Sequence, residues 1–152
     1  MDPWSCTTNL NNGGVTNDQT PLYAWTDLTY LLNQSGVSWK YYNHTGVAAI
    51  WNPVPHFTTV HDDGQLGDVV NANGFFADAA NGTLPAVSWV APNAMVSEHP
   101  PNLVSNGQAW VTSLVNAVMQ GPDWDSTAIF LSWDDWGGFY DHEVPPSADA
   151  NG

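Results

Sequence analysis

The amino-acid sequence predicts an α/β fold in which helices pack on a mainly parallel sheet. Two short apolar runs, residues 85–91 and 127–133, have the composition of strands that are buried on both faces. Residues 105–120, which lie between them, repeat apolar side chains at helical spacing. A strand, a helix and a second strand in this order form a βαβ unit, and the two strands of such a unit are parallel.

The composition allows a folded core and argues against two classes of partner. The chain has 152 residues, of which 43% are apolar, so one domain with a sizeable core is expected. Acidic residues number 15 against one basic residue, Lys40, and the net charge is −14. Nucleic acids and anionic membranes are bound through Lys and Arg, so neither is an expected partner. The sequence contains no apolar run long enough to span a membrane.

The amino-terminal half predicts a lead-in, a helix and a strand. Residues 1–20 are expected to be irregular because Asn and Gly cluster within them. A helix is predicted over residues 27–33, with Thr26 as its N-cap and Gly36 placed to end it. Residues 37–42 alternate and are rich in β-formers, so they predict a strand.

In the rest of the chain, some segments predict their secondary structure weakly and others strongly. Two prolines within residues 51–57 exclude an interior helix or a central strand there. Residues 67–80 give a weak helical pattern that Gly74 interrupts. The strongest helix covers residues 105–120, where Gly121 and Pro122 end it. One apolar stripe runs along that helix and is expected to face the sheet; it includes Trp110, Leu114, Val118 and Met119.

Polar residues follow both of the buried-type strands, where ligands bind in open α/β sheets. Asp134 and Asp135 come directly after residues 127–133, and adjacent carboxylates repel unless a cation lies between them. They are also suited to be a helix N-cap and a first-turn acid. His99 follows the strand at residues 85–91, either as an active-site residue or as a rigid loop residue beside two prolines. His142 is either a residue close to a bound ligand or a residue that pairs with an acidic neighbour in the sequence.

Five runs of consecutive residues form a distinctive set. They are Gly-Val-Ser-Trp-Lys-Tyr-Tyr at 36–42, Ser-Glu-His-Pro-Pro at 97–101, Gly-Gln-Ala-Trp-Val at 107–111, Gly-Pro-Asp-Trp at 121–124 and Trp-Asp-Asp-Trp-Gly-Gly-Phe-Tyr-Asp-His at 133–142. Together they resemble the phosphoesterase family of phosphatidylcholine-type phospholipases C and related acid phosphatases, and the resemblance covers roughly residues 21–146. The last run in combination with Glu-His-Pro-Pro is specific, whereas a lone Asp-Asp pair is not.

The resemblance implies an alkaline-phosphatase-like fold and the hydrolysis of phosphoric esters through a metal-activated Ser or Thr nucleophile. By motif position, Asp134 and Asp135 match a metal-binding pair, for which Mg²⁺, Ca²⁺ or Zn²⁺ is expected. His99 matches an active-site histidine that faces the phosphoryl group, and His142 an active-site neighbour. Lys40 is a weaker candidate for assisting phosphate binding. The implied substrate is a phospholipid or a soluble phosphomonoester.

The family's amino-terminal metal-binding block and its nucleophile segment have no counterpart here, so we expect residues 21–152 to be an internal, partial catalytic domain. The complete protein is expected to be extracellular or periplasmic because Lys is scarce, although no signal peptide is visible. Two alternatives remain open. The chain is a non-catalytic remnant of the fold, or its nine Trp residues serve a carbohydrate-binding module.

Overall fold

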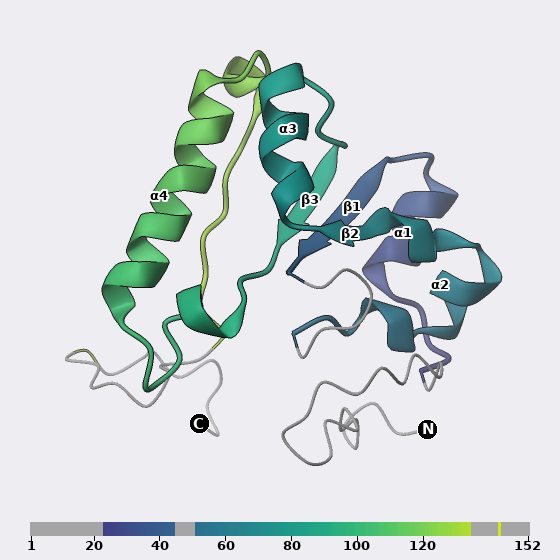
Figure 1. Cartoon of the computed structure of the whole chain (residues 1–152). Coiled ribbons are helices and arrows are strands. Elements are labelled where there is room, and N and C mark those ends of the chain that lie inside the picture. Colours follow the sequence, from purple (N-terminus) through teal and green to yellow (C-terminus); the bar gives the residue numbers. More distant parts are fainter. Residues whose placement is uncertain (1–22, 45–50, 135–142, 144–152) are drawn as a thin grey trace.

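The computed structural model describes residues 23–44, 51–134 and 143. Within them, three strands and four helices alternate, and 3₁₀ turns lie in three of the connections and after the last helix (Figure 1). The lead-in predicted for residues 1–20 lies outside the described residues. The strands are β1 (Trp39–Asn43), β2 (Val69–Asn71) and β3 (Val87–Val90), and the helices are α1 (Leu28–Gln34), α2 (Thr58–Asp62), α3 (Asn73–Asn81) and α4 (Val104–Gln120).

The three strands form one parallel sheet in the order β2-β1-β3. Tyr42 of β1 lies opposite Val70 of β2 on one side and opposite Val90 of β3 on the other. Parallel strands need crossover connections, and α3 with its flanking loops supplies the one from β2 to β3. The predicted α/β class is therefore confirmed.

Each face of the sheet is covered by a different pair of helices (Figure 1). Successive side chains of a strand point to opposite faces, so one strand contributes to the packing on both faces. On one face, Trp39 packs with Val60 of α2 and with Leu32 of α1. On the other, Tyr42 packs with Phe75 of α3 and Val118 of α4. Tyr42 and Val60 are fully buried, one in each core, and β1 contributes to both cores through Trp39 and Tyr42.

Two local predictions were wrong in detail. Helix α1 is capped by Asp27 and not by Thr26, because the Asp27 carboxylate accepts a hydrogen bond from the backbone N–H of Tyr30 at 3.0 Å. The weak helix predicted over residues 67–80 divides into β2 and α3. Val69 and Val70 are β-branched and pair with β1, so tertiary pairing overrides the helical pattern there.

The strand predicted over residues 127–133 is absent from the described sheet, so the second strand of the predicted βαβ unit was wrong. These residues are extended, yet they pair with no described strand. Phe130 is 93% exposed, far from the burial that its apolar neighbourhood predicts. An extended segment becomes a strand only when a neighbour accepts its backbone hydrogen bonds, and β3 pairs only with β1 among the described strands.

Helix α4 confirms the strongest helix prediction and corrects its predicted face. Val118 is buried against Tyr42, and Gly121 follows the last turn as expected. Met119 is 49% exposed, so it does not face the sheet. Leu114 packs at the margin of the core and remains partly exposed. None of the described helices has both the length and the apolar character that crossing a bilayer requires.

Candidate active site

The loop that carries His99 leaves the carboxyl end of β3 and is held by local hydrogen bonds. The Asn93 side chain accepts from the backbone N–H of Met95 at 2.8 Å, which caps a 3₁₀ turn. The Ser97 hydroxyl accepts from the N–H of His99 at 3.2 Å, and the His99 carbonyl accepts from the N–H of Asn102 at 3.0 Å. Short polar side chains of this kind replace a regular ladder where the chain must turn.

The His99 ring is exposed, and its hydrogen bond determines which nitrogen is available. Nδ1 lies 2.7 Å from the carbonyl oxygen of Pro100. A carbonyl can only accept, so Nδ1 carries the proton and donates. Nε2 is then the nitrogen left to act on a ligand, as an acceptor in the neutral ring and as a donor in the imidazolium.

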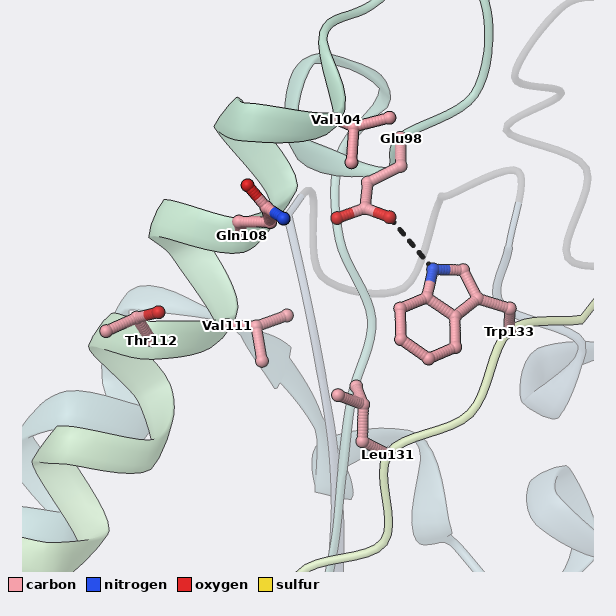
Figure 2. A pocket seen from close by; sticks show the side chains of 7 residues that line it. All are labelled: Glu98, Val104, Gln108, Val111, Thr112, Leu131 and Trp133. Atoms are coloured by element: carbon pink, nitrogen blue, oxygen red, sulfur yellow. Dashed lines mark hydrogen bonds between the residues drawn. The ribbon is translucent and has the colours of Figure 1, made fainter. Parts of the chain in front are cut away.

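Glu98 ties this loop to the residue that precedes Asp134. Its carboxylate Oε2 accepts a hydrogen bond from Trp133 Nε1 at 2.9 Å (Figure 2). The Glu98 backbone has φ of 66°, a left-handed conformation that non-glycine residues seldom adopt. Its side chain also lies against Gly107 of α4, where an added Cβ would come within 2.2 Å of Glu98 Cγ. The His99 loop, α4 and the 127–133 segment therefore meet at one side chain.

A cavity of about 530 Å³ opens beside this contact (Figure 2). Its wall combines apolar side chains with a few polar groups, which is the usual make-up of a ligand site. The residues that line it are Glu98, Val104, Gln108, Val111, Thr112, Leu131 and Trp133. His99 and Asp134 flank two of these residues in the chain, one beside Glu98 and the other beside Trp133.

Of the predicted metal ligands, the structure places only Asp134, which is exposed directly after Trp133. Asp135 and His142 lie outside the described residues. Within the described part of the chain, no three His, Cys, Asp or Glu side chains gather as a metal site requires. A carboxylate oxygen is the donor that hard divalent cations prefer, so Asp134 has suitable chemistry but cannot by itself supply the six or so ligands such a cation needs.

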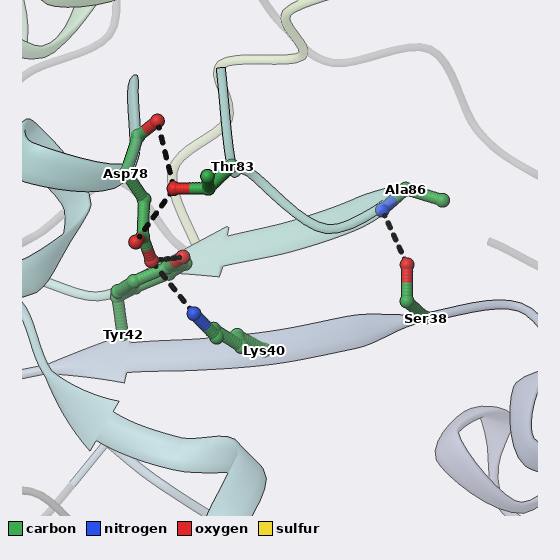
Figure 3. A network of polar contacts seen from close by, with 6 residues as sticks. All are labelled: Ser38, Lys40, Tyr42, Asp78, Thr83 and Ala86. Atoms are coloured by element: carbon green, nitrogen blue, oxygen red, sulfur yellow. Dashed lines mark hydrogen bonds and ion pairs between the residues drawn. The ribbon is translucent and has the colours of Figure 1, made fainter. Parts of the chain in front are cut away.

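Lys40 forms an ion pair with Asp78 at a partly exposed position. Its Nζ lies 2.7 Å from Asp78 Oδ2, and the Tyr42 hydroxyl donates to the same oxygen at 2.5 Å (Figure 3). These contacts hold the pKa of Asp78 below its ordinary value, with the hydrogen bond from Lys40 as the main cause. Burial, and then the Asp78 carboxylate, raises the pKa of Tyr42. The Lys40 charge is thus paired, which weakens its candidacy as a phosphate ligand.

The sequence analysis missed polar residues at the carboxyl ends of the strands. The His44 carbonyl, just after β1, accepts from the Asn71 side chain at 2.8 Å. The His44 ring nitrogen Nδ1 lies 3.5 Å from Nδ2 of Asn93, which follows β3. Asn71 lies within residues 67–80, whose pattern predicts a helix and so hides its position at the end of a strand. The signal for all three was available, since each lies at or just after the end of a strand.

Comparison with known proteins relates this chain to one family. The model of the Phosphoesterase family matches residues 4–152. Phospholipase C B of Mycobacterium tuberculosis is 32% identical over 82% of this chain and 26% of its own length. The non-hemolytic phospholipase C of Burkholderia pseudomallei is 32% identical over 90% of this chain and 24% of its own length. Non-specific phospholipase C6 of Arabidopsis thaliana is 34% identical over 47% of this chain. The chain thus spans about a quarter of the first two relatives.

Proposed function

Because this chain belongs to the Phosphoesterase family, we propose that it forms part of an enzyme that hydrolyses phosphoric ester bonds in the manner of a phospholipase C. The relatives named above are phospholipases C, and the motifs at residues 97–101 and 133–142 are those that resemble this family. Family membership leaves the carbohydrate-binding alternative without support. Trp39, for example, is only 4% exposed and serves the core.

The observation that supports this proposal best is the hydrogen bond between Glu98 and Trp133. It joins two loops that are 35 positions apart in the chain, each of which carries a proposed site residue directly beside the contact. A reaction at phosphorus needs its acid–base group and its charge-stabilising groups within a few ångströms of one another. The Glu98–Trp133 contact therefore supports the proposal that His99 and Asp134 act at one site.

His99 is proposed to act on the phosphoryl group through Nε2. Because Nδ1 donates to the Pro100 carbonyl, the ring is oriented and only Nε2 remains for catalysis. As an imidazolium, it donates a hydrogen bond to a phosphoryl oxygen or a proton to the departing alcohol. The removal of a general acid or base of this kind typically costs about 10²- to 10⁴-fold in rate.

Asp134 and Asp135 are proposed to bind a divalent cation, whose identity among Mg²⁺, Ca²⁺ and Zn²⁺ remains open. Such a cation, when bound, neutralises charge on the phosphoryl oxygens. Asp134 supplies one carboxylate from the described residues, and further ligands are proposed to come from Asp135 and from polypeptide outside this chain. The Ser or Thr nucleophile is likewise proposed to lie outside these 152 residues. His142 is proposed as a neighbour of the same site.

The proposed substrate is a phosphoester with little net negative charge beyond its phosphate, such as a zwitterionic phospholipid, or else a soluble phosphomonoester. The net charge of −14 disfavours approach to an anionic lipid surface. The low Lys content supports an extracellular or periplasmic location for the complete protein.

The test uses a chimera in which this chain replaces the matching segment of phospholipase C B. We expect the chimera to hydrolyse a chromogenic aryl phosphodiester, and His99→Ala or Asp134→Asn to lower turnover by about 100-fold or more. His61→Ala and Asp125→Asn are matched controls outside the proposed site and should retain turnover. An inactive but folded chimera would favour a non-catalytic remnant, and full activity in both site variants would overturn the assigned roles.

The unmodified 152-residue chain provides a second test. It should bind Mg²⁺, Ca²⁺ or Zn²⁺ only weakly and hydrolyse no phosphoester, because the nucleophile and half of the metal ligands are proposed to lie outside it. Calorimetric titration with each metal and a turnover assay check both expectations. Metal-dependent turnover by this chain would contradict the proposal that the nucleophile lies elsewhere.

A further inference from the structure

A second and larger cavity, of about 830 Å³, lies between β3, α4 and the extended residues 127–131; we name it the strand groove. Its floor is apolar and comes from the stripe of α4, including Trp110, Leu114 and Val115. Its two sides are extended backbone, β3 on one and residues 127–131 on the other. In Figure 1 the 127–133 segment runs alongside α4, apart from β3.

The edge of β3 that faces away from β1 offers backbone groups to this groove. The N–H of Val87 donates to Ser38 at 3.0 Å, and that of Ala91 donates to Tyr42 at 2.8 Å. Backbone groups of a parallel strand alternate in direction, so the N–H and C=O of Ser88 and Val90 point the other way. No described strand pairs with that edge. The Ser88 hydroxyl is also buried without a hydrogen-bond partner among the described residues.

The side of the groove formed by residues 127–131 also has no partner among the described strands. Residues 127–133 have the apolar composition of an interior strand, but Ile129 is 45% exposed and Leu131 is 55% exposed. Their backbone pairs with no described strand. Apolar patches of this kind on a folded surface mark contact sites, and unpaired strand edges are templates for another strand.

We propose that the strand groove accepts an apolar β-strand from the part of the family's catalytic domain that these 152 residues do not span. An inserted strand satisfies the backbone groups of both sides and covers the stripe of α4. A small apolar ligand covers the stripe but leaves the two rows of backbone groups unpaired, which is costly once they are buried. A second copy is disfavoured because each chain has a net charge of −14. The relatives are about four times as long as the matched region, so they have ample chain to supply the strand.

Residue-resolved hydrogen exchange tests this inference in the 152-residue chain and in the phospholipase C B chimera. In the chain alone, the amides of Ser88 and Val90 should exchange rapidly, while those of Val87 and Ala91 are protected by β1. In the chimera, Ser88 and Val90 should slow by about 100-fold or more. Rapid exchange of both amides in the folded chimera would overturn the proposal. The readout does not require turnover, so it stands apart from the test of the proposed activity.

A second measurement keeps the inference testable if the chimera does not fold. The chain is co-expressed with the remainder of phospholipase C B as a separate polypeptide, and a one-to-one complex is expected. Ile129→Asp should lower its recovery at least about fivefold, because a charge then enters the groove, whereas Met95→Asp, at a residue 67% exposed and outside the groove, should not. Equal recovery for both variants, or protection of Ser88 and Val90 that rises with the concentration of the chain alone, would overturn the assigned occupant.

Discussion

Trp133 donates its indole N–H to the Glu98 carboxylate over 2.9 Å, and this bond connects the two loops of the proposed active site. The two residues precede Asp134 and His99 in the chain. Neither is expected to touch the reacting atoms, so both are positioning residues. The predictions below concern this contact, the neighbouring Gly107, the Asp78 cluster and the buried side of α4.

Removal of the Trp133 donor should lower kcat more than it changes KM. In the active chimera, Trp133→Phe keeps an aromatic ring but loses Nε1, so the two loops are no longer tied together. Small misplacements of catalytic groups cost up to about 100-fold, and we expect kcat to fall by about 10- to 100-fold. Glu98→Gln retains an acceptor oxygen and should keep most of the activity. Trp124→Phe is the matched control. A lower melting temperature with kcat intact in Trp133→Phe would show that the bond is merely structural.

Gly107→Ala should destabilise the chain, against the usual effect of this substitution in a helix. In a helix interior, Ala is ordinarily better than Gly by about 0.5–1 kcal/mol. Here the new Cβ would lie 2.2 Å from Glu98 Cγ and 2.4 Å from Oε1, so the Glu98 side chain has to move and its hydrogen bond to Trp133 is lost, which costs about 1.5 kcal/mol. In a Glu98→Ala background the three atoms nearest to the new Cβ are absent, so Gly107→Ala should cost less than in the wild type. Urea denaturation of the wild type, the two single variants and the double variant completes a double-mutant cycle. If the effects of the two substitutions on the free energy of unfolding simply add, the predicted clash is contradicted.

The Asp78 cluster should contribute stability that disappears in acid. The pKa of Asp78 lies below its ordinary 3.8, mainly because Lys40 donates to its carboxylate and then because Tyr42 does. A carboxyl group whose pKa is lowered by folding stabilises the protein above its unfolded pKa, and this stabilisation is lost as the pH falls through the folded pKa.

We therefore expect Asp78→Asn to lower the free energy of unfolding by about 1 kcal/mol near neutral pH, a value between those of exposed and buried charged hydrogen bonds. The difference from wild type should shrink once the pH drops below 3.8. Urea midpoints across the pH range measure it, with Asp125→Asn as the control for the loss of one exposed charge. A difference that is constant with pH would show that the Asp78 charge contributes nothing.

Adjacent residues of α4 should differ sharply in their effect on stability. Val118 is 4% exposed and packs on Tyr42, so Val118→Ala should cost about 1.5–3 kcal/mol. Met119 is 49% exposed, so Met119→Ala should stay within about 0.5 kcal/mol. Denaturant unfolding of the two variants checks the pair. Similar losses from both would mean that the helix is rotated relative to the sheet.

Helix α4 could be predicted from the sequence because its determinants are local. Helical hydrogen bonds join residues four apart, so the spacing of Trp110, Leu114 and Val118 and the end at Gly121 carry the information that the helix needs. The motifs around His99 and Asp134 could likewise be recognised from the sequence, because each is a run of consecutive residues. The α/β class was predicted correctly, although one strand of the βαβ unit on which that prediction rested is absent from the described sheet.

Only the tertiary structure decided which extended segments became strands. Val69 and Val70 form β2 because Tyr41 and Tyr42 lie beside them, although their own neighbourhood resembled a helix. Residues 127–133 look more like a strand, yet no described strand lies beside them to accept their hydrogen bonds. The backbone of a strand is satisfied by residues distant in the chain, so composition gives the capacity to form a strand, and the neighbour that the fold supplies determines whether the strand forms.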